Sequence, residues 1–393
     1  MEIRKIIDDK QILQKFVDLQ CYCFNLDRDI VEFELDKMFG KDESIILGGF
    51  LDNQLQGSLI INDFNIYWNG LNVKMGGIGG VTTFPEARQN HVVSQLLIES
   101  LEIMNENNQI FSLLAPFSFS FYRKYGWEYG TTMKAMELDI DGLSHFKSQG
   151  YALKPIGKEH IQAAKQVYEK YYSSFNGPSK RTDLRWDVTF ERNLGNKVFS
   201  YGVFDDDDTL RGYIFYKLID NQFVVREMVY DSLEVRKQLL YFIYVHRAQV
   251  EKVKFVMPEN DKLDMILTNQ KLKMVIEPYM MVRVINVKKV LEMFPFRNVH
   301  SLDFSIGIED KYASWNNTVF EVKVDDDKIQ VAENENRKPD ISCSIQVFSQ
   351  VIFGFISIEE AFNLELVSCD DINLIEKLNK IIPKKCSYIT DGF

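Results

Sequence analysis

The stretch that decides the fold is Gly76-Gly-Ile-Gly-Gly-Val-Thr-Thr-Phe-Pro-Glu-Ala-Arg-Gln-Asn-His-Val-Val93. The β-branched and aromatic run Val81–Phe84 favours a strand, and Pro85 cannot continue a strand ladder. Apolar residues then recur with a helical period from Val92 to Met104, so a helix follows the turn. The start of a helix leaves backbone N–H groups unpaired and carries the positive end of the helix dipole, and both features favour a bound pyrophosphate.

A second strand follows that helix. The apolar run Ile110–Leu114 predicts it, and a short amphipathic segment then leads through Tyr122 to Tyr125-Gly-Trp127. The start of the helix therefore lies between two strands. Nucleotide-binding motifs fit less well, because the run Gly77–Thr82 lacks the third glycine of the dinucleotide fingerprint and no Gly-Lys-Ser/Thr follows.

Two segments resemble motifs of the GNAT N-acetyltransferases. Pro85–Val93 aligns with their Arg-x-x-Gly-x-Gly/Ala loop, and Phe121–Glu128 resembles their Phe-Tyr-x-Lys-x-Gly-Phe/Tyr-Glu segment. The two small positions of the loop pattern fall on His91 and Val93, where small residues allow backbone amides to approach the phosphates closely. The resemblance implies acetyl-CoA as co-substrate.

Composition sets broad limits on the function. The chain has 393 residues, of which 46% are hydrophobic and 26% charged, enough for two or three soluble domains; we expect three. A net charge of −11 argues against general nucleic-acid binding and permits cationic substrates. Met1–Lys10 has no apolar core of signal-peptide length, and no apolar run reaches ~18 residues. We expect a cytoplasmic protein that does not enter a membrane.

Neither the cysteines nor the acidic runs predict a metal site. The five cysteines are odd in number and lack Cys-x-x-Cys spacing, so reduced structural thiols are favoured over a redox or zinc role. The run Asp205–Asp208 lacks the spacing of a calcium loop and is interpreted as a solvated hairpin turn.

The first domain is predicted to span residues 1–148. Two short helices in residues 11–40 precede an antiparallel meander over residues 44–81, with turns at Asp52-Asn53 and Asn69-Gly70. The glycine-cluster strand, the helix and the second strand follow in GNAT order. Met133–Ile140 is expected to close this sheet.

The second domain is predicted to span residues 149–288. An amphipathic helix at His160–Tyr172, strands at 198–204, 210–218 and 223–230, and a helix at 234–249 repeat the strand–helix–strand order. No glycine-rich turn follows Met228-Val-Tyr230. We interpret this part as a second GNAT-like domain without a coenzyme site.

The third domain is predicted to span residues 289–393, with alternating strands followed by two helices. It resembles the sterol-carrier-type domain that ends the Eis acetyltransferases in Ile306-x-Ile308-x-Asp310, Trp315-Asn316, Pro339-Asp-Ile341 and Gly354-Phe-Ile-Ser357. The end, Tyr388-Ile-Thr-Asp-Gly-Phe393, resembles the short tail of that family. The expected fold class is α/β (α+β), with two tandem GNAT-like mixed-sheet domains and a sterol-carrier-like domain whose C-terminus returns to the active site.

N-acetyl transfer requires two proton-handling groups, because the attacking amine loses a proton and the leaving thiolate gains one. By the Eis resemblance, Tyr122 is the acid and the terminal carboxylate of Phe393 is the base. A core tyrosine and a frayed tail are the alternatives. The same resemblance assigns coenzyme binding to one set of residues, with Arg88 as a surface charge the alternative: Val81, Thr82, Thr83, Arg88, Gln89, Asn90, His91, Val92 and Val93.

The resulting hypothesis is an Eis-like N-acetyltransferase with one active site per chain, in the first domain. The resemblance implies acetylation of primary amines, including aminoglycosides or other polycationic amines, and assembly into a homo-oligomer, commonly a hexamer. The alternative is a non-catalytic acyl-CoA- or lipid-binding protein, or a scaffold, in which His91 and Val93 have eroded the coenzyme loop.

Overall fold

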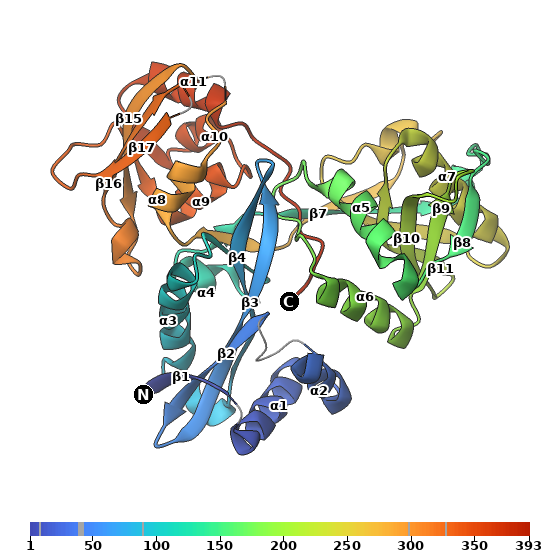
Figure 1. Cartoon of the computed structure of the whole chain (residues 1–393), viewed down its shortest axis with the longest axis horizontal. Coiled ribbons are helices and arrows are strands. Elements are labelled where there is room, and N and C mark those ends of the chain that lie inside the picture. Colours follow the sequence, from blue (N-terminus) through green and yellow to red (C-terminus); the bar gives the residue numbers. More distant parts are fainter. Residues whose placement is uncertain (8, 38–42, 89, 298, 327) are drawn as a thin grey trace. The chain divides into compact units, whose positions relative to one another are not determined.

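The computed structural model describes residues 1–7, 9–37, 43–88, 90–297, 299–326 and 328–393 (Figure 1). These residues form three mixed sheets with helices packed against them, so the expected α/β (α+β) class is confirmed. Contacts divide the chain into two units. Unit 1 contains residues 1–131, 279–385 and 391–393, and unit 2 contains residues 132–278 and 386–390.

The first sheet of unit 1 has the strand order β1-β2-β3-β4-β5-β14-β6. Its strands are β1 Glu2–Lys5, β2 Ser44–Leu51, β3 Gln54–Trp68, β4 Leu71–Thr83, β5 Phe111–Leu114, β14 Met281–Val284 and β6 Glu128–Tyr129. Both predicted hairpin turns are confirmed. Asp52, Asn53, Asn69 and Gly70 all have positive φ, as the two-residue turns that match strand twist require.

Helices cover both faces of this sheet (Figure 1). Successive side chains of β2 and β3 point to opposite faces of the sheet, and each face packs against a different helix. Leu47, Leu59 and Ile61 pack with α3 Val92–Glu106, which lies along one face. Ile46 and Ile60 pack on the other face with α1 Lys10–Phe24, which is followed by α2 Arg28–Lys37.

Strands β4 and β5 pair in parallel only from Met75↔Phe111 to Ile78↔Leu114. Beyond Ile78, β4 continues to Thr83 on the β3 side, where a bulge places Gly80 at φ 54°. We call the place where the two strands stop pairing the β4/β5 fork. The strand–turn–helix order predicted from residues 76–93 is thus observed.

One predicted strand pairing is wrong. The segment expected to close the first sheet forms β7 Thr132–Asp139, which lies in the sheet of unit 2 between β13 and β12. Its place in the first sheet is taken by β14, which pairs with β5 and β6. The alternating pattern of β7 satisfies either sheet locally, so only long-range pairing decides which one it joins.

The sheet of unit 2 has the order β13-β7-β12-β11-β10-β9-β8. Its remaining strands are β8 Ala152–Pro155, β9 Phe199–Phe204, β10 Leu210–Ile219, β11 Gln222–Tyr230, β12 Lys252–Met257 and β13 Lys273–Pro278. The main helices are α5 Ile161–Tyr172, α6 Asp183–Gly195 and α7 Leu233–Tyr244. The apolar face of α7, including Leu239 and Ile243, packs on the sheet with Phe223 and Val253.

The third sheet belongs to unit 1 and has the order β17-β16-β15-β18-β19. Its strands are β15 Ser301–Glu309, β16 Val319–Asp325, β17 Lys328–Glu333, β18 Ile341–Ser344 and β19 Val367–Cys369. Four helices accompany it: α8 Val287–Met293, α9 Ile345–Ile352, α10 Ile358–Asn363 and α11 Ile372–Ile381. Helix α9 also packs on β14, where the Ser349 hydroxyl accepts a hydrogen bond from Val284 N–H at 2.8 Å.

The structure agrees with the interpretation of the cysteines as free thiols and of Asp205–Asp208 as a hairpin turn. All five cysteines lie in the described part of the chain and are free, and burial raises the pKa of Cys343 to about 12 and of Cys386 to about 11. Asp205 accepts from the N–H groups of Asp207 and Thr209 in a hairpin turn.

In the described residues, no helix has the length and apolar character to cross a bilayer, and no three His, Cys, Asp or Glu residues are grouped as metal ligands.

Candidate active site

The predicted catalytic residues lie on opposite faces of the first sheet, at the β4/β5 fork. Side chains alternate along a strand, and Gly77, Ile78 and Gly79 are regularly paired with β3. Ile78 points to the face covered by α3, where it shares a core with Tyr122 and Leu114. The two glycines face the other way.

The chain terminus is seated on these two glycines. A Cβ on Gly77 would come within 2.9 Å of the ring of Phe393, and a Cβ on Gly79 would come within 2.8 Å of its carboxyl carbon. The Phe393 ring also packs on Phe64, with 5.0 Å between ring centroids. Two positions without side chains therefore make room for the last residue, and the terminal carboxyl group lies against β4 at the fork.

Tyr122 lies on α4 Phe119–Arg123, which begins where Ser118 Oγ accepts from Phe121 N–H. Its side chain is 2% exposed and its ring contacts those of Phe117 and Phe121. Burial raises the pKa of Tyr122 well above its ordinary value, so the hydroxyl stays protonated at neutral pH. No hydrogen bond joins this hydroxyl to another described residue. A protonated, uncommitted hydroxyl has the properties of a proton donor.

The predicted phosphate-binding loop leads into the start of α3. Arg88, Asn90 and His91 are exposed, whereas Gln89 lies outside the described residues. His91 is the residue before the helix, has φ 57°, and makes no capping hydrogen bond through its side chain to the described residues. The His91 side chain therefore does not occupy the first-turn N–H groups of α3, and groups of this kind favour an anion. Val92 is buried and Val93 half-buried, both packing into the core that contains Tyr122.

The three residues expected to offer backbone bonds, Val81 to Thr83, end β4 beyond the fork. The side chain of Thr82 is used internally, because its hydroxyl lies 2.8 Å from Ser58 Oγ. Gln20 of α1 donates to Gly80 O at 2.9 Å and so holds the bulge. Sequence reasoning missed Gln20; its signal was a polar residue on the apolar face of an amphipathic helix.

Asp310 was part of a motif quoted from the sequence, but its pairing with Arg283 was not predicted. Arg283 is fully buried on β14 and its Nη2 lies 2.8 and 2.9 Å from the two carboxylate oxygens of Asp310. Gly126 has φ 93°, and a Cβ there would lie 1.4 Å from Arg283 Nη1. The glycine of the Tyr125-Gly-Trp127 turn is thus required by the arginine behind it.

Asp310, Trp315 and Asn316, which belong to the motif that resembles the sterol-carrier-type domain, bond to β14 and to the residue after it. Asp310 also accepts from Tyr312 N–H and Ala313 N–H, and Asn316 donates to Ile285 O at 3.0 Å. Trp315 Nε1 donates to Ile285 O at 2.8 Å. The segment between β15 and β16 therefore supports β14, the strand that neighbours β5, although the two are distant in sequence from the fork.

Three parts of the chain match known families of domains. Residues 2–130 and residues 177–284 each match an acetyltransferase (GNAT) domain. Residues 287–390 match the sterol carrier protein domain. The predicted order of two GNAT-like domains and a sterol-carrier-like domain is confirmed by these matches; the predicted limits at residues 148 and 288 stay predictions.

Several solved structures share the fold over the full chain. A conserved protein of unknown function from Enterococcus faecalis V583, a probable N-acyltransferase, is 23% identical with a TM-score of 0.91, covering 100% of this chain and 99% of that one. A GCN5-related N-acetyltransferase from Anabaena variabilis ATCC 29413 is 19% identical with a TM-score of 0.87, covering 100% of both chains. Eis1 from Mycobacterium abscessus is 16% identical with a TM-score of 0.80, again covering 100% of both. No curated protein matches the sequence.

Proposed function

Since this chain belongs to the GNAT acetyltransferases, we propose that it transfers an acetyl group from acetyl-CoA to a primary amine at the β4/β5 fork. The observation that carries the proposal is the position of the chain terminus. The carboxyl carbon of Phe393 lies against Gly79, and Tyr122 shares a core with Ile78, the residue between the two glycines. The two groups that we propose as acid and base thus flank the same strand.

Tyr122 acts as the proton donor. The sulfur leaves as a thiolate, and the neutral hydroxyl of the buried Tyr122 supplies the proton. Removing a general acid costs on the order of 10²–10⁴-fold in rate.

The terminal carboxylate of Phe393 acts as the proton acceptor for the amine. Free terminal carboxylates have pKa values near ~3.5, so the group is ionised at neutral pH and attracts a cationic amine. The Phe393 carboxyl group is held in one place, because the residue lies against Gly77 and Gly79 and its ring packs on Phe64. A mobile chain end could not position a catalytic group in this way.

The residues present fit acetyl-CoA as co-substrate. The first N–H groups of α3 and the exposed Arg88 would hold its phosphates, and the backbone of Val81 to Thr83 would bond its arm. The bound thioester supplies the electrophilic acetyl carbon. The position of His91 favours glycine, because φ 57° strains a residue that has a Cβ.

Among amines, the net charge of −11 favours polycationic acceptors, including aminoglycosides. The alternative is a protein that binds an acyl-CoA or lipid without transferring the acyl group. Thiol release with acetyl-CoA and a panel of amines separates the two. Release above the amine-free rate supports transfer, whereas a rise in melting temperature with acetyl-CoA but no release for any amine favours the binding protein.

A further inference from the structure

Unit 2 has a fork of its own. Strands β11 and β12 pair in parallel only where Gln222–Val224 meets Lys252–Lys254. Beyond that point β11 stays bonded to β10 and β12 stays bonded to β7. The two strands therefore separate in the same way as β4 and β5 do in unit 1. In unit 2 we call this place the β11/β12 fork.

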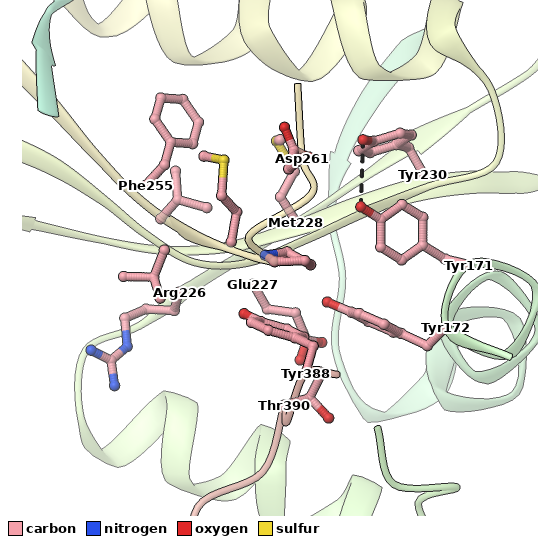
Figure 2. A pocket seen from close by; sticks show the side chains of 14 residues that line it. Tyr171, Tyr172, Arg226, Glu227, Met228, Tyr230, Phe255, Asp261, Tyr388 and Thr390 are labelled. Carbon is pink, nitrogen blue, oxygen red and sulfur yellow. Dashed lines mark hydrogen bonds between the residues drawn. The ribbon is translucent and has the colours of Figure 1, made fainter. Parts of the chain in front are cut away.

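The β11/β12 fork is occupied by residues 386–390 of the same chain, which we call the tail (Figure 2). A pocket there is lined by β11 from Val225 onward, by β12 from Phe255 onward, and by Tyr388 and Thr390 of the tail. The volume left in it is about 30 Å³. A water needs roughly 10–15 Å³, so the remaining space is large enough for two or three waters and too small for a coenzyme arm.

The tail is bound as an extended peptide. Asn176 N–H donates to Cys386 O at 3.1 Å, and Tyr388 N–H donates to Asn176 O at 2.9 Å, forming a parallel bridge between Asn176 and Ser387. Asn176 lies between α5 and α6 and belongs to no sheet, so this isolated bridge fixes the backbone of Ser387 at one point.

Two side chains of the tail have specific partners. The ring of Tyr388 stacks on that of Tyr172, with 6.2 Å between centroids and 13° between planes. Figure 2 shows the two rings lying side by side. Thr390 Oγ1 lies 2.7 Å from the hydroxyl of Tyr168. Tyr388 is 7% and Ile389 5% exposed, so the segment is buried like a ligand.

In unit 2, the helix after β11 does not begin with the uncapped N–H groups that would attract a pyrophosphate. The hydroxyl of Ser232 caps α7 by accepting from Val235 N–H. The residue before it, Asp231, carries a carboxylate that is paired with Arg211 at 2.6 Å. The start of α7 is therefore already capped by a side chain, and the cations near it, Arg211 and Lys170, are already paired with Asp231.

We propose that the second GNAT-like domain is a peptide-binding domain whose ligand is the chain's own C-terminal segment, Ser387–Thr390. The ligand class is an extended peptide with tyrosine two residues before threonine. All contacts that support this lie within unit 2, so the proposal does not depend on the acetyl-transfer chemistry.

The first test measures hydrogen exchange of the tail in the full-length chain. Tyr388→Ala removes the stacked ring, and we expect amide exchange in residues 386–390 to become on the order of 10-fold faster or more. Tyr168→Phe removes one hydroxyl and should accelerate exchange less. Tyr241→Phe, on α7 of the same domain, is the control and should change nothing. If the tail exchanges equally fast in wild type and in Tyr388→Ala, the proposal is overturned.

The second test separates the two ends of the tail. A protease site inserted between Lys385 and Cys386 allows the folded full-length chain to be cut, after which we expect the released peptide to co-elute with the protein in gel filtration. Tyr388→Ala should release it. Release by Phe393→Ala with full retention in Tyr388→Ala and Tyr168→Phe would mean that only the terminal residue is held, which overturns the proposal. Retained peptide without any acetyl transfer would contradict the proposed function and leave this binding site intact.

Discussion

The carboxyl carbon of Phe393 lies 2.8 Å from the point where a Cβ on Gly79 would be. Real Cβ atoms do not approach another carbon so closely, so the terminal group occupies space that exists only because residue 79 has no side chain. The next glycine on the same face, Gly77, makes room for the Phe393 ring in the same way.

Gly79→Ala should therefore displace the terminal carboxylate. We expect amine acetylation to fall by about 10²-fold, since a displacement near 1 Å has that effect on positioned groups, while acetyl-CoA binding remains. Gly195→Ala is the matched control, because no described atom lies within 4 Å of its Cβ position. Steady-state rates with one amine, together with calorimetric binding of acetyl-CoA, measure both effects. A fully active Gly79→Ala enzyme would show that the position of the Phe393 carboxyl group against residue 79 does not matter for catalysis.

Extending the chain beyond Phe393 should abolish most acetylation while the fold persists. Added residues keep the ring on Phe64 but convert the carboxylate to a neutral amide. The comparison is a C-terminally extended protein beside an N-terminally tagged one, assayed against the same amine. Equal rates would show that the terminus is not the base.

Tyr122→Phe should reduce turnover on the order of 10²–10⁴-fold and leave acetyl-CoA affinity nearly unchanged. The hydroxyl matters only when the thiolate leaves. Tyr216→Phe is the control, because burial also raises the pKa of Tyr216 but this residue lies in unit 2. A Tyr122→Phe enzyme that turns over like wild type would remove Tyr122 from the mechanism.

The same tyrosine predicts an alkaline effect on stability. Its folded-state pKa is raised above the unfolded value near ~10, so between these two values the unfolded chain binds fewer protons than the folded one. The free energy of unfolding is unaffected by this group below pH ~10 and falls as pH rises above it. Urea unfolding at pH 9 to 11 should show a shallower decline for Tyr122→Phe than for wild type.

His91→Gly should tighten acetyl-CoA binding. Glycine tolerates φ 57° without strain and lets backbone N–H groups at the start of α3 approach the phosphates more closely. Lys197→Gly relieves a comparable φ of 54° in unit 2 and should leave the affinity unchanged. The affinity is measured by calorimetry: unchanged binding by His91→Gly would mean that the histidine already points away from the phosphates, and weaker binding that it makes a useful contact.

Asp310→Asn should destabilise the chain by about 3–5 kcal/mol, because it leaves the fully buried Arg283 without its charged partner. Gly126→Ala should destabilise it too, since its Cβ would overlap Arg283. Gly195→Ala again serves as control. Urea denaturation reports the free energy of unfolding directly, and a loss below about 1 kcal/mol for Asp310→Asn would show that the pair is easily replaced.

Much of the fold was determined by the sequence locally. The positive φ of Asn69 and Gly70 follows from residue types that tolerate it, and the strand–turn–helix order around residues 76–93 follows from Pro85 and the helical period of the apolar residues after it. The motif Phe121–Glu128 and the last residue, Phe393, are likewise recognisable in the sequence alone, by resemblance to a family.

Only the tertiary structure decided which sheet each ambiguous strand joins and what each special glycine serves. Strand β7 fits either sheet by its own pattern, and pairing with β12 and β13 places it in unit 2, while β14, from much later in the chain, fills the first sheet. Gly126 makes room for Arg283, and Gly79 makes room for the end of the chain. These are contacts between residues far apart in sequence, and no local period or propensity encodes them.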